Sequence, residues 1–290
     1  RLGSCSRARS MALRASATSY DDVQIQAEAA SIFRICGDDS NLKTTSTTAR
    51  TLMMDDGEDW IDSAIRRGNG TDQEGALRRL GWLRAMYPDD GIVAKEMGLL
   101  WSHLGDHALA LAELELSLTL PPLSSEKGSK AIRVANRRVD QMDAAEKREA
   151  ISAIWDEIIG IHKARNDKMG VAGAMESQLA ARLDKAPEDY VVVSQAWERA
   201  GAYDQAVAAC LKAVKQTTNH VEAHTQCARM YAKLGDLKSA IGHARVAFEQ
   251  RPSDADLTVL LGQLHLAGYN RREARRVFSI GVRHHPDDPR

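Results

Sequence analysis

Two histidines in the C-terminal third have the spacing of a metal-binding pair. His220 and His224 lie four residues apart, with Glu222 between them. In zinc proteases with histidines at this spacing, the catalytic glutamate directly follows the first histidine, so the acid here stands one place late. We therefore expect these histidines to be structural. We expect no metal, no cofactor and no catalysis.

The sequence contains four cysteines, Cys5, Cys36, Cys210 and Cys227, and no CxxC pair. The missing CxxC pair argues against a zinc site or a redox motif. Cys210 and Cys227 fall on the apolar stripes of successive predicted helices. The favoured interpretation is a pair of free thiols in the core, and a disulfide between them is the alternative.

A third group that could do chemistry is a cluster of arginines near the C-terminus, Arg271, Arg272, Arg275 and Arg276, with Arg283 beyond. A patch that binds RNA or phosphate is one interpretation, but no interleaved aromatic residue could stack on bases. Because the net charge is −1, the protein as a whole does not attract nucleic acid or an acidic membrane electrostatically. We favour a solvated helix face and do not expect nucleic acid as a partner.

The elements that must position these groups are clearest in residues 221–254, which predict two helices joined at Gly235. The first helix carries apolar or small residues at helical spacing, and Ala228 and Ala240 must face each other where the two helices cross closely. Gly235 is expected to adopt a left-handed backbone conformation at the turn, and Pro252 closes the unit.

This pattern recurs at a step of 34 residues in the ranges 57–90, 91–124, 187–220 and 255–288. The set resembles the tetratricopeptide repeat (TPR) family, whose unit has that length. The resemblance implies an all-α fold, a right-handed α-solenoid of about five to seven hairpins, with a groove lined by the first helix of each hairpin. It also implies a non-catalytic role in holding other proteins.

The resemblance further implies which side chains face the groove: Lys95, Gln195, Arg199, Arg229, Lys233 and Gln263. Amide and guanidinium groups would bind a partner peptide or helix, and the cations would pair with its acidic groups. The alternative is a solvated face without a dedicated ligand. One TPR subclass clamps the C-terminal carboxylate of chaperone tails, but Leu99, Asp256 and Leu260 replace residues that the clamp needs, so chaperone tails are not expected.

Domain boundaries follow from composition. Residues 1–20 hold four arginines, five serines and no acid, which is typical of an organellar transit peptide, with a disordered tail as the alternative. Residues 21–50 predict a short helix over 22–36 and a polar linker over 37–50. Residues 51–124 predict repeats, residues 125–186 degenerate helical hairpins or an insert, and residues 187–290 three repeats. No run of about 18 apolar residues predicts a membrane span.

We expect a scaffold or adaptor that holds a protein or peptide partner, serving complex assembly in a plastid or mitochondrion if the N-terminus is a transit peptide and in the cytoplasm otherwise. Two alternatives stay open, a regulatory region of a larger enzyme or secretion machine and an RNA-binding helical-repeat protein. Self-association through the ends of the solenoid is also open.

Overall fold

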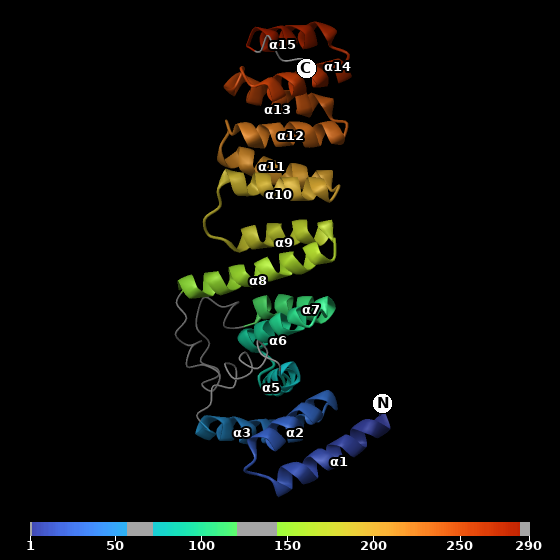
Figure 1. The fold of residues 1–290 in the computed structure, drawn as a ribbon, viewed down its shortest axis with the longest axis vertical. Helices are drawn as coiled ribbons and strands as arrows, with labels where there is room; N and C mark the ends of the chain where they lie inside the picture. The colour runs from blue at the N-terminus through green and yellow to red at the C-terminus, as the bar shows by residue number, and fades with distance from the viewer. Residues whose placement is uncertain (1, 57–71, 121–143, 285–290) are drawn as a thin grey trace. The chain divides into compact units, whose positions relative to one another are not determined.

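The computed structural model describes residues 2–56, 72–120 and 144–284, and these residues form fourteen α-helices and no strand. The chain divides into two compact units, Arg1–Glu157 and Ile158–Arg290. Within the described residues, no helix has the length and hydropathy needed to cross a membrane. Figure 1 shows the order of the helices.

The first unit contains α1 to α7 and the beginning of α8. The bounds are α1 Leu2–Thr18, α2 Val23–Ile35, α3 Asp39–Asp56, α5 Gln73–Met86, α6 Gly91–His103, α7 His107–Thr119 and α8 Ala144–Ala164. Leu80, Leu83 and Met86 of α5 are buried against α2 and α6 in one core cluster. The Arg34 guanidinium donates a 2.7 Å hydrogen bond to the Ala85 carbonyl and so joins α2 to the end of α5.

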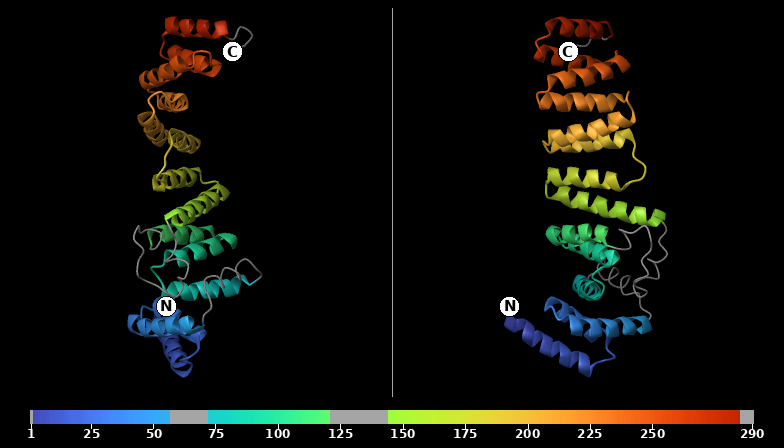
Figure 2. Two further views of the ribbon diagram at one scale, coloured as in Figure 1. Left: turned by 90° about the vertical axis from the view of Figure 1, so that its left-hand side faces the viewer. Right: turned by 180° about the vertical axis from the view of Figure 1, so that it is seen from behind.

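The second unit begins within α8 and continues as α9 Lys168–Ala181, α10 Pro187–Arg199, α11 Tyr203–Gln216, α12 Val221–Lys233, α13 Leu237–Gln250, α14 Ala255–Ala267 and α15 Arg271–His284. From α9 onward each helix packs on the next, and α10 also packs on α12 (Figure 2). The predicted all-α fold, a solenoid of helical hairpins, is confirmed.

The same turn joins the two helices of six hairpins. The residue at each turn has a positive φ: Gly37, Gly105, Gly201, Gly235, Asn166 and Tyr269. The next backbone N–H donates to the carbonyl five residues earlier, as Asp236 does to Tyr231 at 2.9 Å, and this bond ends the first helix. In five of the six hairpins the next residue then caps the second helix by accepting from a backbone N–H, and these residues are Asp38, Asp106, Asp167, Asp236 and Asn270. The predicted left-handed turn at Gly235 is confirmed.

Small residues set the helix crossings, as predicted. Ala228 and Ala240 are fully buried in one cluster. A Cβ added to Gly262 would lie only 2.3 Å from the ring of Phe278, and one added to Gly98 would lie 2.7 Å from Leu114. Larger side chains at these glycines would therefore separate the helices, because packed interiors have no spare volume.

The N-terminal segments differ from the predictions. The linker predicted over residues 37–50 is wrong, because residues 39–56 form α3, which packs on α2 as the second helix of a hairpin. The threonine hydroxyls of α3 are satisfied within the helix, as Thr45 donates to the Asn41 carbonyl at 2.7 Å. The helix is held by its packing on α2, where Ala49 is buried in one cluster with Ala27 and Ala30. A disordered tail is also wrong for residues 2–18, since α1 packs Ala12 against Ala29 and Phe33 of α2.

Two predicted segments lie partly outside the described residues. For the unit 57–90, the structure describes the second helix, α5, while the segment 57–71 lies outside. For the region 125–186, it describes one hairpin, formed by α8 and α9, and residues 121–143 lie outside. The helical hairpins predicted over residues 125–186 can therefore be compared only from residue 144 onward.

Candidate partner-binding face

The first helices of the C-terminal hairpins are α10, α12 and α14, and we call the exposed residues that they present together the first-helix face. α10 packs directly on α12. The buried Gln226 of α12 donates a 2.8 Å hydrogen bond to the carboxylate of Glu198 on α10. α10 and α12 are thus held side by side by a specific polar contact as well as by apolar packing.

The structure places five of the six predicted partner-binding residues on these helices. Arg199, Arg229, Lys233 and Gln263 are exposed, and Gln195 is half-buried. Gln195, Arg229 and Gln263 occupy equivalent positions of successive repeats, as do Arg199 and Lys233, so each set runs along the array. The sixth residue, Lys95, belongs to the other unit, where it pairs with Glu96 at 2.9 Å.

Acidic side chains at the start of the same helices already have partners within the chain. Glu188 lies 3.0 Å from Nε2 of His220, and Glu222 lies 2.7 Å from the Arg251 guanidinium. The hydrogen bond with His220 holds the pKa of Glu188 below its ordinary value. Each of these acids is therefore paired with a residue near the end of its own 34-residue unit.

Cations on the face are in a different situation. Arg199, Arg229 and Lys233 form no ion pair with any described residue. Arg199 and Lys233 lie in the last turns of α10 and α12, where a cation also favours the helix dipole. Arg229 lies in mid-helix, so the dipole does not account for it. On the first-helix face, the acidic side chains are thus already paired, whereas the cations can still bind a ligand.

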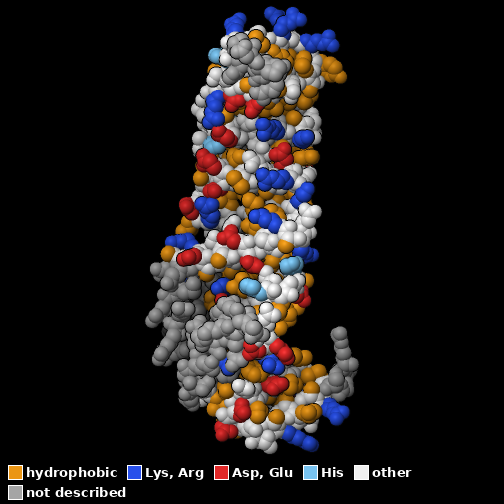
Figure 3. Space-filling model, viewed as in Figure 1, with side chains coloured by type: hydrophobic (Ala, Val, Ile, Leu, Met, Phe, Trp, Pro, Cys, Tyr) orange, Lys and Arg blue, Asp and Glu red, His pale blue; other side chains and the backbone are white. Residues whose placement is uncertain are grey.

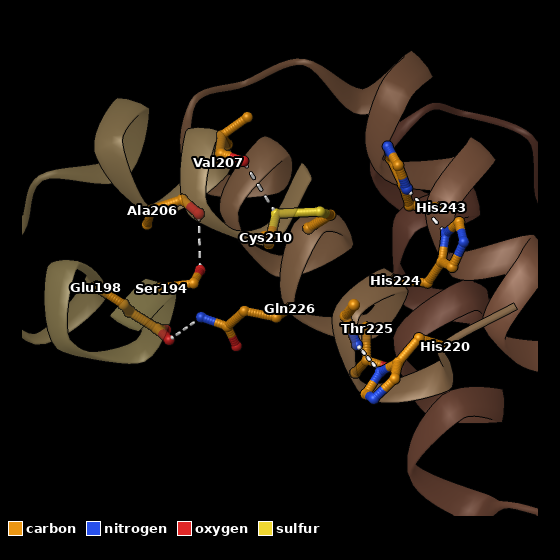
Figure 4. The surroundings of a disulfide bond; sticks show 12 residues. Ser194, Glu198, Ala206, Val207, Cys210, His220, His224, Thr225, Gln226 and His243 are labelled. Atoms are coloured by element: carbon orange, nitrogen blue, oxygen red, sulfur yellow. Dashed lines mark hydrogen bonds between the residues drawn. A yellow bond between two sulfur atoms is a disulfide. The ribbon is translucent and has the colours of Figure 1, made fainter. Parts of the chain in front are cut away.

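The histidines act as structural groups, as expected. His224 is buried; its Nε2 lies 2.8 Å from the Thr218 carbonyl and its Nδ1 lies 2.9 Å from Nδ1 of His243 (Figure 4). Because the carbonyl can only accept, Nε2 of His224 carries a proton, and its Nδ1 accepts from His243. Burial lowers the pKa of His243, and the neighbouring His224 lowers it further. Among the described residues, no group of three His, Cys, Asp or Glu side chains could hold a metal ion.

The favoured interpretation of Cys210 and Cys227 as free thiols is wrong, because the two form a disulfide (Figure 4). Both residues are fully buried, and their Cα atoms lie 5.6 Å apart, within the reach of a disulfide. The bond joins α11 of one repeat to α12 of the next. A second disulfide, which the sequence analysis missed, joins Cys5 of α1 to Cys36 at the end of α2.

Comparisons with known proteins add little about function. No protein-family profile matches the sequence, and no curated protein matches it. Among solved structures, the chain is similar to YrrB, described as a TPR protein with an unusual peptide-binding site, at 17% identity over 72% of this chain and 93% of that chain, with a TM-score of 0.41. It is similar to MamA at 13% identity over 67% and 91%, with a TM-score of 0.41. It is also similar to PilW, described as a widely conserved type IV pilus biogenesis factor, at 13% identity over 79% and 94%, with a TM-score of 0.41.

Because these identities and TM-scores are low, the fold is assigned from the geometry of the hairpins themselves. They have the repeat step, the left-handed turn after the first helix, and small residues where the helices cross. By these features of its own geometry, the chain has the fold of an α-solenoid built from TPR-like helical hairpins.

Proposed function

We propose that this chain is a non-catalytic scaffold or adaptor that holds an acidic segment of a partner protein, as a peptide or a helix, on the first-helix face. The observation that carries the proposal is the asymmetry of charge on that face. Arg199, Arg229 and Lys233 have no ionic partner among the described residues, whereas Glu188 and Glu222 are bound to the chain itself.

This asymmetry favours an acidic ligand for a simple electrostatic reason. A carboxylate that approaches the cations displaces only water, whereas a basic ligand would have to break the contacts of Glu188 and Glu222 with His220 and Arg251. The amides of Gln195 and Gln263 can bond to a ligand backbone on either side of Arg229. Charge would then set the choice of partner, and the amides would fix its position.

The test is a capture experiment with the full chain. Arg229→Glu combined with Lys233→Glu should lose partners that the unchanged protein retains, because the face then repels carboxylates. Lys215→Glu combined with Lys238→Glu makes the same change of charge on exposed positions of the second helices α11 and α13. If that control loses the same partners, or if the face variant loses none, binding at this face is contradicted.

The finer role of an organellar assembly factor also remains part of this proposal. It rests on the Arg- and Ser-rich residues 1–20. A fluorescent protein fused after residue 290 should then accumulate in plastids or mitochondria, and deletion of residues 1–20 should abolish that accumulation. Import that survives the deletion would contradict this role.

A further inference from the structure

The second helix of each hairpin has a face that the next hairpin covers. In α13 this face packs on Leu257, Leu261 and Leu264 of α14. The residues of α13 that form it are Leu237, Ile241, Ala244 and Phe248. In α11 the equivalent residues are Tyr203, Val207, Cys210 and Val214, and Val207 packs in one cluster with Met230 of α12. The protein thus shows twice how a helix docks on a second helix.

In α15 the same four positions hold Arg271, Arg275, Phe278 and Val282. Val282 is 63% exposed, both arginines are exposed, and Phe278 is half-buried over Gly262. No helix among the described residues covers them. Lys and Arg side chains gather at this end of the second unit in the space-filling view (Figure 3). The face is therefore basic in its first half and apolar in its second half.

Tyr269, at the turn before α15, is a second unusual feature of the same end. Four of the equivalent turn residues are glycines and one is Asn166, whereas Tyr269 has a φ of 59° and is 92% exposed. A bulky residue in the left-handed region is strained, and such outliers cluster where a side chain has a task. We call Tyr269, Arg271, Arg275, Phe278 and Val282 the end face.

The internal packing also fixes the direction in which a helix would lie on the end face. A Cβ on Gly268, just beyond α14, would lie 3.7 Å from Ile241 Cδ1, and Arg275 is the equivalent of Ile241 in α15. The last turn of a docked helix would therefore lie over the arginines, and its first turns over Phe278 and Val282. The negative end of the helix dipole would meet the two guanidinium groups.

We propose that the end face is a second docking site, which takes a partner helix with apolar residues in its first turns and carboxylates in its last turn. Arg271 and Arg275 form no ion pair within the described residues, whereas Arg276 lies 2.8 Å from Glu273. A second copy of α15 docked in this direction would set Arg283 and His284 of its last turn against these two arginines. Single-stranded RNA would use the arginines and Tyr269 but not the apolar half.

The probe is a helical peptide that copies residues 254–268, the segment that covers α13, with His265→Glu and Gly268→Glu placing carboxylates in its last turn. A matched peptide carries His265→Lys and Gly268→Lys. Fluorescence anisotropy with the full chain should show that the acidic peptide binds at least about tenfold more tightly than the basic one. Arg271→Glu with Arg275→Glu should reverse this preference.

The control protein is Arg272→Glu, which reverses one positive charge on α15 outside the end face. The equivalent positions of α11 and α13, Asp204 and Lys238, are exposed as well. It should keep most of the affinity for the acidic peptide. Equal binding of both peptides, an equal loss with Arg272→Glu, or displacement of the peptide by oligo(U) RNA would each overturn the proposal. Concentration-dependent dimers that Arg271→Glu with Arg275→Glu abolishes would also overturn it, since they would assign the face to a second copy.

The same variants leave Arg229 and Lys233 untouched. Failure at the end face is therefore distinguishable from failure at the first-helix face.

Discussion

Two successive boundaries between repeats have one geometry and different chemistry. Between residues 187–220 and 221–254, Cys210 and Cys227 meet and form a disulfide. At the next boundary the equivalent residues are Ala244 and Leu261, which pack without a covalent bond. The repeat determines which positions meet at a boundary, and the residue types at those positions determine whether the contact is a disulfide or apolar packing.

The boundary between α13 and α14 should be the more sensitive to loss of apolar volume. Leu261 is 2% exposed, and Leu261→Ala should lower the free energy of unfolding by about 3–4 kcal/mol, because a cavity is left and no covalent bond holds the helices together. Urea denaturation followed by circular dichroism measures the loss, and hydrogen exchange locates it in α13 and α14. A loss confined to α11 and α12 would contradict the comparison.

The boundary between α11 and α12 should depend on its disulfide. Cys210→Ala with Cys227→Ala should lower the free energy of unfolding by about 3 kcal/mol, because the bond closes a loop of 17 residues in the unfolded chain. Cys5→Ala with Cys36→Ala serves as the matched control and should leave hydrogen exchange in α11 and α12 unchanged. Peptide mapping without reduction should find Cys210 linked to Cys227, and free thiols there would contradict the structure.

The turns offer a smaller contrast. Gly235→Ala should destabilise the chain by about 1 kcal/mol, because a Cβ is strained at a φ of 82°. Tyr269→Gly should stabilise it by about 0.5 kcal/mol while weakening the acidic peptide at the end face. Thermal melts measure the two changes of stability, and the anisotropy assay measures the affinity for the acidic peptide. A Tyr269→Gly protein that binds the acidic peptide as tightly as the unchanged chain would contradict a role for the tyrosine at the end face.

The smallest effect concerns pH. The pKa of His243 is lowered in the folded state, first by burial and then by His224. As the pH falls below about 6.5, the unfolded chain takes up its proton first, so stability should decrease toward pH 5.5. His243→Gln should flatten this dependence in thermal melts between about pH 7.5 and pH 5.5. An unchanged slope would mean that other groups cause it.

The sequence predicted the parts of the fold that depend on sterics. Gly235, Gly262 and the pair Ala228 and Ala240 are small for reasons of backbone conformation and close crossing, so their spacing alone indicates the hairpin. The hairpin over residues 23–56 was missed, although Gly37-Asp38 repeats the Gly105-Asp106 turn two units later. Its threonines are typical of loops, and packing on α2 holds them in a helix.

The candidate site was less accessible to prediction. Periodicity places Arg229 and Lys233 on exposed positions, but only coordinates show which charges are already paired, as Glu222 is with Arg251. The disulfide depends on two Cα atoms lying 5.6 Å apart, which the spacing of Cys210 and Cys227 in the chain does not reveal. The end face could be found only by comparing α15 with helices that are covered.

The most direct test of the central proposal is to locate the partner on the protein. A photo-crosslinking amino acid at Gln263, exposed and uncharged on the first-helix face, should capture the partner's acidic segment. The same amino acid at Gln250, exposed on α13, should not. Crosslinks from position 250 and none from position 263 would contradict binding on the first-helix face.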